Sequence, residues 1–388
     1  MILDQISYLD CIIFLIFLTP QLILHVGLLK TSFWLVGALP HIAIKIPYQF
    51  IHERFFMPFD QRTPFVQRAT PFQDLVIRYV RFAFAHMPSF IGRVFFSKPV
   101  SLPFLRWRML RHGYLRSPIP WREINHQKFT GVWIVPDESR EPDVVVYYCH
   151  GGGFSMGSSY FYMEFLIAWV ALLKAAGFSN PALLALEYTL VPDAVYPKQI
   201  QETYFGYKYL LSIVEDPSRI CVAGDSAGGT LILSLLLYLS ESELRNQLPA
   251  LACMISPWVT LISEKNRNTP SDYLDASSLR LYGSQYIGTK VSPEDPMVSP
   301  GNCKDVHRWA RASPLKGWSF QLGSEEVLGP ETYDLIDVLR KAGQQVHVSE
   351  EEGGIHAWPV ALLYLGESRD ERLHGLADIV GIMVKRMQ

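Results

Sequence analysis

A serine flanked by glycines, at Gly224 to Gly229, is the residue group best suited to chemistry in this chain. The stretch reads Gly-Asp-Ser-Ala-Gly-Gly and lies between apolar runs at 220–223 and 230–237. This context predicts a buried strand, a sharp turn and a buried helix. In the pattern Gly-x-Ser-x-Gly, here with Asp225 at the first variable position, Gly224 and Gly228 permit a strained turn that presents the Ser226 hydroxyl over a sheet. The positive end of the following helix would then face any anion formed beside Ser226.

A run of glycines after an earlier strand supplies the second half of such a site. The apolar stretch 143–149 leads directly into His150 and the three consecutive glycines Gly151, Gly152 and Gly153. Glycines leave backbone N–H groups uncovered, as binding of an oxyanion requires. We expect His150 to brace this loop through hydrogen bonds. The expected oxyanion donors are the N–H groups of Gly152, Gly153 and Ala227.

The segments around these two loops alternate between strand-like and helix-like patterns. Short apolar runs rich in β-branched residues predict strands at 131–136, 143–149, 182–186, 219–223, 251–255, 318–322 and 345–348. Longer apolar or amphipathic segments predict helices at 160–176, 204–214, 230–237 and 370–385. This alternation predicts an α/β fold with a mainly parallel sheet covered by helices on both faces. Catalytic loops are then expected at the carboxyl ends of the strands.

Taken together, several motifs resemble the hormone-sensitive-lipase family of α/β-hydrolases. They occur in the family's order from about Val144 to the C-terminus. They are His150 to Gly153, Glu187-Tyr188 with Pro192, Tyr196-Pro197, Gly224 to Gly229, Ser256-Pro257-Trp258, and Asp295-Pro296 with Ser299-Pro300. With its apolar N-terminus, the chain is also similar to the fungal steryl acetyl hydrolase branch, a less specific match. The resemblance implies an α/β-hydrolase fold with a helical cap and a reaction that uses no metal or organic cofactor.

The resemblance also indicates where the other members of a catalytic triad stand. They should follow Ser226 in the order acid, then histidine. The family pattern places an acid two residues before a leucine, which selects Glu326, with Glu325 as the alternative. The glycine-led loop 353–359 resembles the family's histidine loop, and His356 is the expected base. A glutamate at the acid position departs from the aspartate that many members carry.

The N-terminal region carries most of the excess apolar character of a chain in which 49% of residues are hydrophobic. From Cys11 to Leu29 no side chain is charged, and a second apolar stretch follows at 31–44. This length fits a retained membrane anchor, in the endoplasmic reticulum or another intracellular membrane, on a side that stays open. The alternatives are a re-entrant hairpin, a helix in the membrane interface, and a helix folded onto the catalytic domain as part of its lid.

We therefore expect three regions: an anchor at 1–50, basic and aromatic helices at 51–122, and a catalytic domain at 123–388. The second region could form part of the cap or lie near the membrane. A cap insertion at about 261–300 would contribute to specificity through apolar and aromatic side chains. These are Tyr273, Leu279, Leu281, Tyr282 and Tyr286.

The predicted activity is hydrolysis of a hydrophobic ester, such as a short acyl or acetyl ester of a sterol, a terpenoid or another lipophilic metabolite. The expected partners are this substrate and a membrane, and a formal net charge of −2 gives no reason to expect nucleic acid. Three alternatives stay open. They are acyl transfer to an alcohol, hydrolysis of a lactone or amide, and a catalytically silent lipid-binding scaffold.

Overall fold

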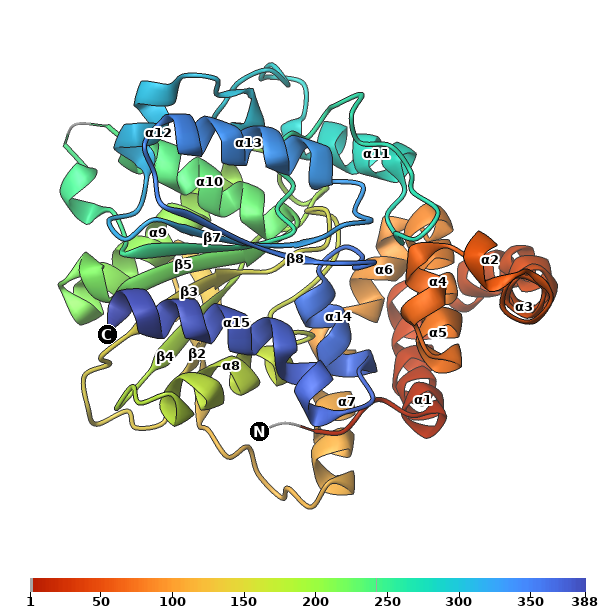
Figure 1. The fold of residues 1–388 in the computed structure, drawn as a ribbon. Coiled ribbons are helices and arrows are strands. Elements are labelled where there is room, and N and C mark those ends of the chain that lie inside the picture. Colours follow the sequence, from red (N-terminus) through yellow and green to blue (C-terminus); the bar gives the residue numbers. More distant parts are fainter. Residues whose placement is uncertain (1–2, 242) are drawn as a thin grey trace.

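A single eight-stranded sheet forms the centre of the molecule in the computed structural model, which describes residues 3–241 and 243–388 (Figure 1). Its strand order is β1-β2-β4-β3-β5-β6-β7-β8. The strands are β1 (Trp121–His126), β2 (Phe129–Ile134), β3 (Val145–Cys149), β4 (Ala182–Glu187), β5 (Ile220–Asp225), β6 (Leu251–Ile255), β7 (Trp318–Gly323) and β8 (Val346–Glu351).

The sheet is mainly parallel, as the sequence pattern predicts. From β4 through β8 every neighbouring pair is parallel, whereas β1 pairs with β2 and β2 pairs with β4 in antiparallel fashion. The expected strands correspond to β2 through β8, and β1 is an additional edge strand. Because β3 to β8 are parallel, the loops after them gather at one edge of the sheet.

Helices cover both faces of this sheet (Figure 1). Those on one face are α9 (Lys198–Val214), α10 (Ala227–Leu239), α12 (Val306–Ala312) and α13 (Gly329–Lys341), and those on the other are α8 (Met163–Ala175) and α15 (Arg369–Met387). Side chains of β3 alternate between the two layers: Tyr147 and Cys149 join the first core, and Val146 and Tyr148 join the second. This alternation follows from the two-residue period of a strand.

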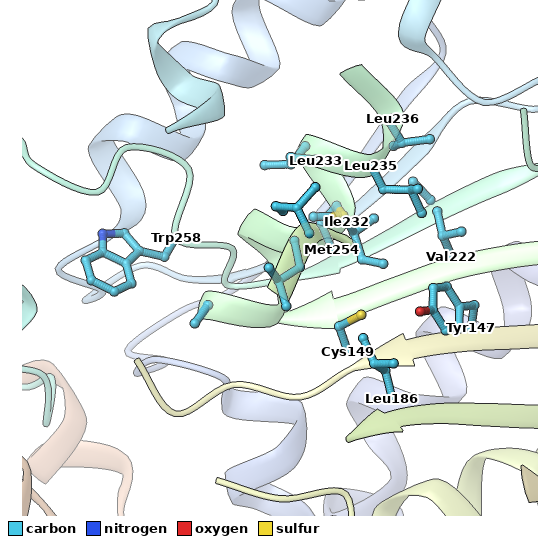
Figure 2. Close-up of a cluster of buried hydrophobic side chains, with 14 of the residues drawn as sticks. Tyr147, Cys149, Leu186, Val222, Ile232, Leu233, Leu235, Leu236, Met254 and Trp258 are labelled. Carbon is cyan, nitrogen blue, oxygen red and sulfur yellow. The ribbon is translucent and has the colours of Figure 1, made fainter. Parts of the chain in front are cut away.

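Helix α10, which follows the serine turn, is the most deeply buried helix. Ile232 and Leu235 lie over Val222 of β5 and Met254 of β6 in the core shown in Figure 2. Since almost every side chain of α10 is buried, the helix is held firmly against the sheet. A rigid α10 fixes the position of its own N-terminus, where Ser226 stands.

A helical layer lies beyond the carboxyl ends of the strands (Figure 1). Its helices come from the N-terminal region and from the segment between β6 and β7. They are α1 (Tyr8–His25), α2 (Leu28–Pro40), α3 (Ile46–Ile51), α4 (Pro64–Arg68), α5 (Pro71–His86), α6 (Ser89–Phe95) and α11 (Ala276–Ile287), with π-helical turns at His41–Lys45 and His52–Phe56. Helix α7 (Lys98–Arg111) follows α6 and packs on the side of the sheet that carries α8. A last helix, α14 (Trp358–Leu365), follows the histidine loop.

The N-terminal region shares its packing with the hydrolase core. Leu3 and Leu105 belong to the same buried cluster as Val146, and the N–H of Ile6 donates to the carbonyl of Tyr364. Within the described ranges, α1 is the one helix with the length and hydropathy of a membrane span, at a mean hydropathy of 1.7. It packs along α6 and α7 instead of projecting from the body.

Candidate active site

Ser226 occupies a strained turn between β5 and α10. Its φ and ψ angles are 49° and −119°, a backbone conformation with positive φ that non-glycine residues rarely adopt. The turn is possible because Gly224 and Gly228 pack against each other: a Cβ on Gly224 would lie 2.6 Å from the carbonyl carbon of Gly228. A Cβ on Gly228 would lie 2.0 Å from the carbonyl oxygen of Cys149. Both glycines are therefore required by close backbone approach.

Asp225 links the serine turn to the glycine loop. Its Oδ1 accepts hydrogen bonds from the N–H of Gly151 at 2.7 Å and the hydroxyl of Tyr148 at 2.6 Å. Its Oδ2 accepts from the hydroxyl of Tyr162 at 2.7 Å. Burial raises the pKa of Asp225, while the hydrogen bonds from the two tyrosines act in the opposite direction. The two tyrosines were not among the expected site residues, because nothing in their local sequence connects them to residue 225.

Two of the three N–H groups of the glycine loop, those of Gly152 and Gly153, are free of protein partners in the described residues. In residues 3–241 and 243–388, the N–H groups of Gly152, Gly153 and Ala227 donate to no protein acceptor. A Cβ on Gly151 would lie 3.1 Å from the Cβ of Ser226, so the loop lies directly against the nucleophile turn. N–H groups that donate to no protein acceptor are available to bind a developing oxyanion.

His150 supports this loop from beneath. Its ring stacks on Tyr188 with centroids 4.3 Å apart, and its Nδ1 lies 2.7 Å from the carbonyl of Gly151. Burial lowers the pKa of His150 to about 4, so the ring is neutral at physiological pH and donates from Nδ1. His150 therefore contacts the loop that it is expected to brace.

Glu326 and His356 face each other in the loops after β7 and β8. The Oε2 of Glu326 lies 3.7 Å from the Nδ1 of His356, and both side chains are buried. The other oxygen, Oε1, accepts hydrogen bonds from the N–H of Gly323 at 2.7 Å and from the hydroxyl of Ser256. The alternative acid, Glu325, is partly exposed and makes its hydrogen bonds through its backbone.

Ser256 is a further site residue that sequence reasoning did not assign a role. It stands at the end of β6 with a φ of 43°. Its hydroxyl donates to Glu326 and accepts from the N–H of Ala357 at 2.9 Å, so it joins the acid loop to the histidine loop. The Ser-Pro-Trp motif was visible in the sequence, but the partners of its serine lie 70 and 101 residues away.

Burial shifts the pKa values of both the acid and the base. It raises the pKa of Glu326 to about 8 and lowers the pKa of His356. Each charged form is disfavoured when it is buried without an opposite charge. The ionised carboxylate therefore gains most when it faces an imidazolium, the state in which a histidine has just accepted a proton.

Aromatic side chains roof the site, so that Ser226 is 6% exposed and His356 is 3% exposed. The ring of Tyr273 contacts the His356 ring edge-on at 5.7 Å, and Phe84 of α5 packs against Tyr273 at 5.2 Å. Tyr282 of α11 covers Gly153, where a Cβ would lie 3.0 Å from its ring.

The remaining expected cap residues lie farther from the chemistry. Tyr286 stacks on Phe154 with centroids 3.8 Å apart, and Leu279 is buried in the core. Leu281 is exposed. No cluster of three or more His, Cys, Asp or Glu side chains suited to a metal ion occurs in 3–241 or 243–388.

Comparison with known proteins connects this geometry to a family. A family described by the α/β hydrolase fold matches residues 146–360, which include the serine turn, the glycine loop and the histidine loop. The chain belongs to the α/β hydrolase fold family. It is 32% identical to an acetyl-hydrolase of Streptomyces hygroscopicus over 59% of this chain and 72% of that protein.

For two further relatives, the match covers a smaller share of the relative's length. An esterase of Acinetobacter venetianus is 28% identical over 52% of this chain and 63% of that protein. A Schizosaccharomyces pombe protein, provisionally named a steryl acetyl hydrolase, is 28% identical over 52% of this chain and 55% of that protein. With relatives of these names, the resemblance to the hormone-sensitive-lipase family is confirmed, and the chain is a carboxylic ester hydrolase of esterase type.

Solved structures agree on the fold. An esterase of the bacterial hormone-sensitive lipase family superposes with a TM-score of 0.65 at 24% identity, covering 82% of this chain and 99% of that one. A hormone-sensitive lipase from a metagenome library gives a TM-score of 0.63 at 21% identity, covering 81% and 98%.

Proposed function

We propose that this esterase hydrolyses a short acyl ester of a hydrophobic alcohol through Ser226, His356 and Glu326. The hydroxyl oxygen of Ser226 attacks the ester carbonyl carbon, and its proton passes to the imidazole of His356. The oxyanion is received by the N–H groups of the glycine loop and of Ala227, each worth roughly 3 kcal/mol by comparison with measured oxyanion holes.

The second half of the reaction regenerates the enzyme. Collapse of the tetrahedral intermediate breaks the ester C–O bond, and His356 gives its proton to the departing alcohol. Water then attacks the acyl-Ser226 carbonyl with His356 again accepting a proton, and the acid leaves. In its ionised form, Glu326 holds the imidazole in the tautomer with hydrogen on Nδ1 and stabilises the imidazolium.

A pair of unpartnered buried atoms carries this proposal. Oε2 of Glu326 and Nδ1 of His356 are both buried, and in the described chain neither has a hydrogen-bond partner. They lie 3.7 Å apart, slightly beyond hydrogen-bond length. An unsatisfied buried polar atom is costly, and catalytic hydrogen bonds are often long before substrate binds. Each atom supplies what the other lacks, so a small closure would satisfy both.

The aromatic side chains over the site and the names of the similar proteins both support this substrate class. A site covered by the rings of Phe84, Tyr273 and Tyr282 favours an apolar alcohol portion. Relatives named acetyl-hydrolase and steryl acetyl hydrolase support an acetyl or other short acyl group.

A panel of esters tests this proposal. We expect the full chain to hydrolyse p-nitrophenyl acetate with a higher kcat/KM than the decanoate, and to release acetate from an acetylated sterol. Analysis of products with and without an added alcohol distinguishes hydrolysis from acyl transfer, and matched lactones and amides test those alternatives. A preference for decanoate, or no release from the sterol ester, would contradict the substrate class.

We also propose that the apolar N-terminal layer rests in a lipid membrane. One face of α1 packs on the body through Phe14 and Leu18, while the opposite face is apolar and exposed. The exposed apolar side chains of α1 and α2 are Tyr8, Leu9, Ile12, Leu15, Ile16, Ile23, Leu24, Leu28, Leu29, Phe33, Leu35, Val36 and Leu39. An apolar surface of this extent marks an interaction site.

Charge and packing indicate that this surface contacts lipid and that α1 lies within one leaflet of the membrane. Between residues 11 and 52 the only charged side chains are Lys30 and Lys45, both exposed, which suits anionic headgroups. Asp10 is buried against Arg108, Arg111 and the indole of Trp107, which pins α1 along the body. A helix pinned on one side presents its other side to lipid in the manner of an interfacial helix.

A further inference from the structure

We propose that Asp272, in the segment before the cap helix α11, is a positioning residue that sets the distance between Glu326 and His356. The inference rests on the proposed triad. Asp272 lies 55 residues before the acid loop and 84 before the histidine loop that it contacts. No sequence motif marks it.

The carboxylate of Asp272 bridges the two catalytic loops. Its Oδ2 accepts from the N–H of Val327 at 2.8 Å, directly after Glu326. Its Oδ1 accepts from the N–H of His356 itself at 3.1 Å. Because each oxygen fixes the backbone beside one triad member, the carboxylate acts as a spacer between acid and base.

Thr269 adds a second connection to the acid loop, and we call the segment from Thr269 to Asp272, with its hydrogen bonds to both catalytic loops, the clip. The hydroxyl of Thr269 accepts from the N–H of Asp272 at 3.0 Å and donates to the carbonyl of Glu325 at 2.6 Å. The acid and histidine loops also bond directly, from the N–H of Glu325 to the carbonyl of Gly354 at 3.0 Å. Segment 269–272 therefore holds the acid loop at two points and the histidine loop at one.

The charge of Asp272 is fully enclosed, since the residue is 1% exposed. Burial raises the pKa of its carboxyl, and hydrogen bonds from backbone N–H groups oppose that shift. Arg81 of α5, which is partly buried, donates to the carbonyl of Ser271 at 2.6 Å and so brings a cation to the same segment. A buried carboxylate is costly, so its retention between two catalytic loops points to a role in setting their geometry.

Kinetics of Asp272→Asn in the full chain test this inference, with Asp275→Asn as the matched control. Asparagine keeps one acceptor oxygen but places an NH2 against a backbone N–H, which separates the loops. We expect kcat for p-nitrophenyl acetate to fall about 10- to 100-fold with KM within about 3-fold, because the contact positions groups that act in the transition state. Asp275 caps α11 through its carboxylate, asparagine caps equally well, and the control should keep kcat.

A second variant covers the case in which Asp272→Asn does not fold. Thr269→Val removes the other half of the clip without touching a charge, and we expect a smaller fall in kcat, about 3- to 10-fold, with the thermal midpoint nearly unchanged. The rate at which a fluorophosphonate labels Ser226 should fall in parallel in both variants. Unchanged kcat and labelling rate in a folded variant would overturn the positioning role, whereas failure of wild-type Ser226 to label would overturn the triad itself.

Discussion

Glu325 and Glu326 are neighbours in the sequence but lie in different environments. Glu326 is buried with one oxygen 3.7 Å from His356, whereas Glu325 is partly exposed. We expect Glu326→Gln to lower kcat/KM by about 10³- to 10⁴-fold, because an amide cannot stabilise the imidazolium or hold its tautomer. Glu325→Gln should change kcat/KM less than about 3-fold. Ester hydrolysis by the two purified variants measures this, and equal losses would contradict the assignment of the acid.

Glu326 should also make the free energy of unfolding depend on pH. Burial raises the pKa of Glu326 to about 8, from 4.5 for an unperturbed glutamate. Between these values the folded state holds a proton that the unfolded chain has released, so the free energy of unfolding decreases as pH rises through this window. Glu326→Gln cannot titrate, and its free energy of unfolding should decrease less steeply.

Urea unfolding at pH 5 and pH 8 measures this difference. The wild type contains other acids whose pKa values are raised by burial, including the partly buried Glu187 and the buried Asp225. Only the difference in slope between wild type and Glu326→Gln therefore reports on residue 326. Parallel pH dependences would show that Glu326 is ionised in the fold at pH 5.

At the scale of elements, the glycine loop after β3 depends on close contact with Asp225. A Cβ on Gly151 would lie 2.3 Å from Oδ2 of Asp225, so Gly151→Ala must displace the loop and its oxyanion donors. We expect kcat for p-nitrophenyl acetate to fall about 10²- to 10³-fold with little change in KM.

A glycine with free space provides the control. A Cβ on Gly381, in α15, meets nothing within 4 Å. Gly381→Ala should keep full activity and stabilise the helix by about 0.5–1 kcal/mol. A loss of activity in both variants would indicate a general disturbance of the fold, and no loss in Gly151→Ala would exclude this loop as the oxyanion site.

The elements that could be predicted from the sequence are those whose pattern is local. Strands β3 to β6 are runs of apolar residues, and the serine turn lies within its own motif, so β-propensity and glycine spacing were sufficient. The acid and histidine loops required the family resemblance. Asp272 and Ser256 were not assigned roles, because they act on backbone N–H groups far along the chain.

The cap was the element predicted least well. Tyr273 and Tyr282 lie over the site, but Leu281 is exposed and Tyr286 packs on Phe154. Composition indicated an apolar cap without revealing which side chains face inward. Helix α5 also contributes Phe84 to the roof, so part of it comes from the N-terminal region.

At the scale of the whole molecule, the N-terminal layer joins the apolar surface that we propose rests in lipid to the roof of the active site. Phe33 of α2 is 85% exposed, and we expect Phe33→Glu to weaken co-sedimentation with phosphatidylcholine–phosphatidylserine vesicles at least about 5-fold, because a charge opposes entry into lipid. Leu315, 62% exposed before β7, lies outside this layer. Leu315→Glu should bind vesicles like the wild type. Equal binding by both variants, or self-association that Phe33→Glu abolishes, would indicate another occupant of the surface.

The central claim is that Ser226 is the nucleophile of a working triad, and covalent labelling tests it most directly. The full chain would be treated with a fluorophosphonate, digested, and the modified peptide identified by mass spectrometry, in the wild type and in Ser226→Ala. We expect one adduct, on Ser226, with loss of ester hydrolysis in proportion to labelling, and a fall of at least about 10⁴-fold in kcat for Ser226→Ala. Ester hydrolysis that persists in folded Ser226→Ala, or a folded wild type that neither labels nor hydrolyses any ester, would contradict it.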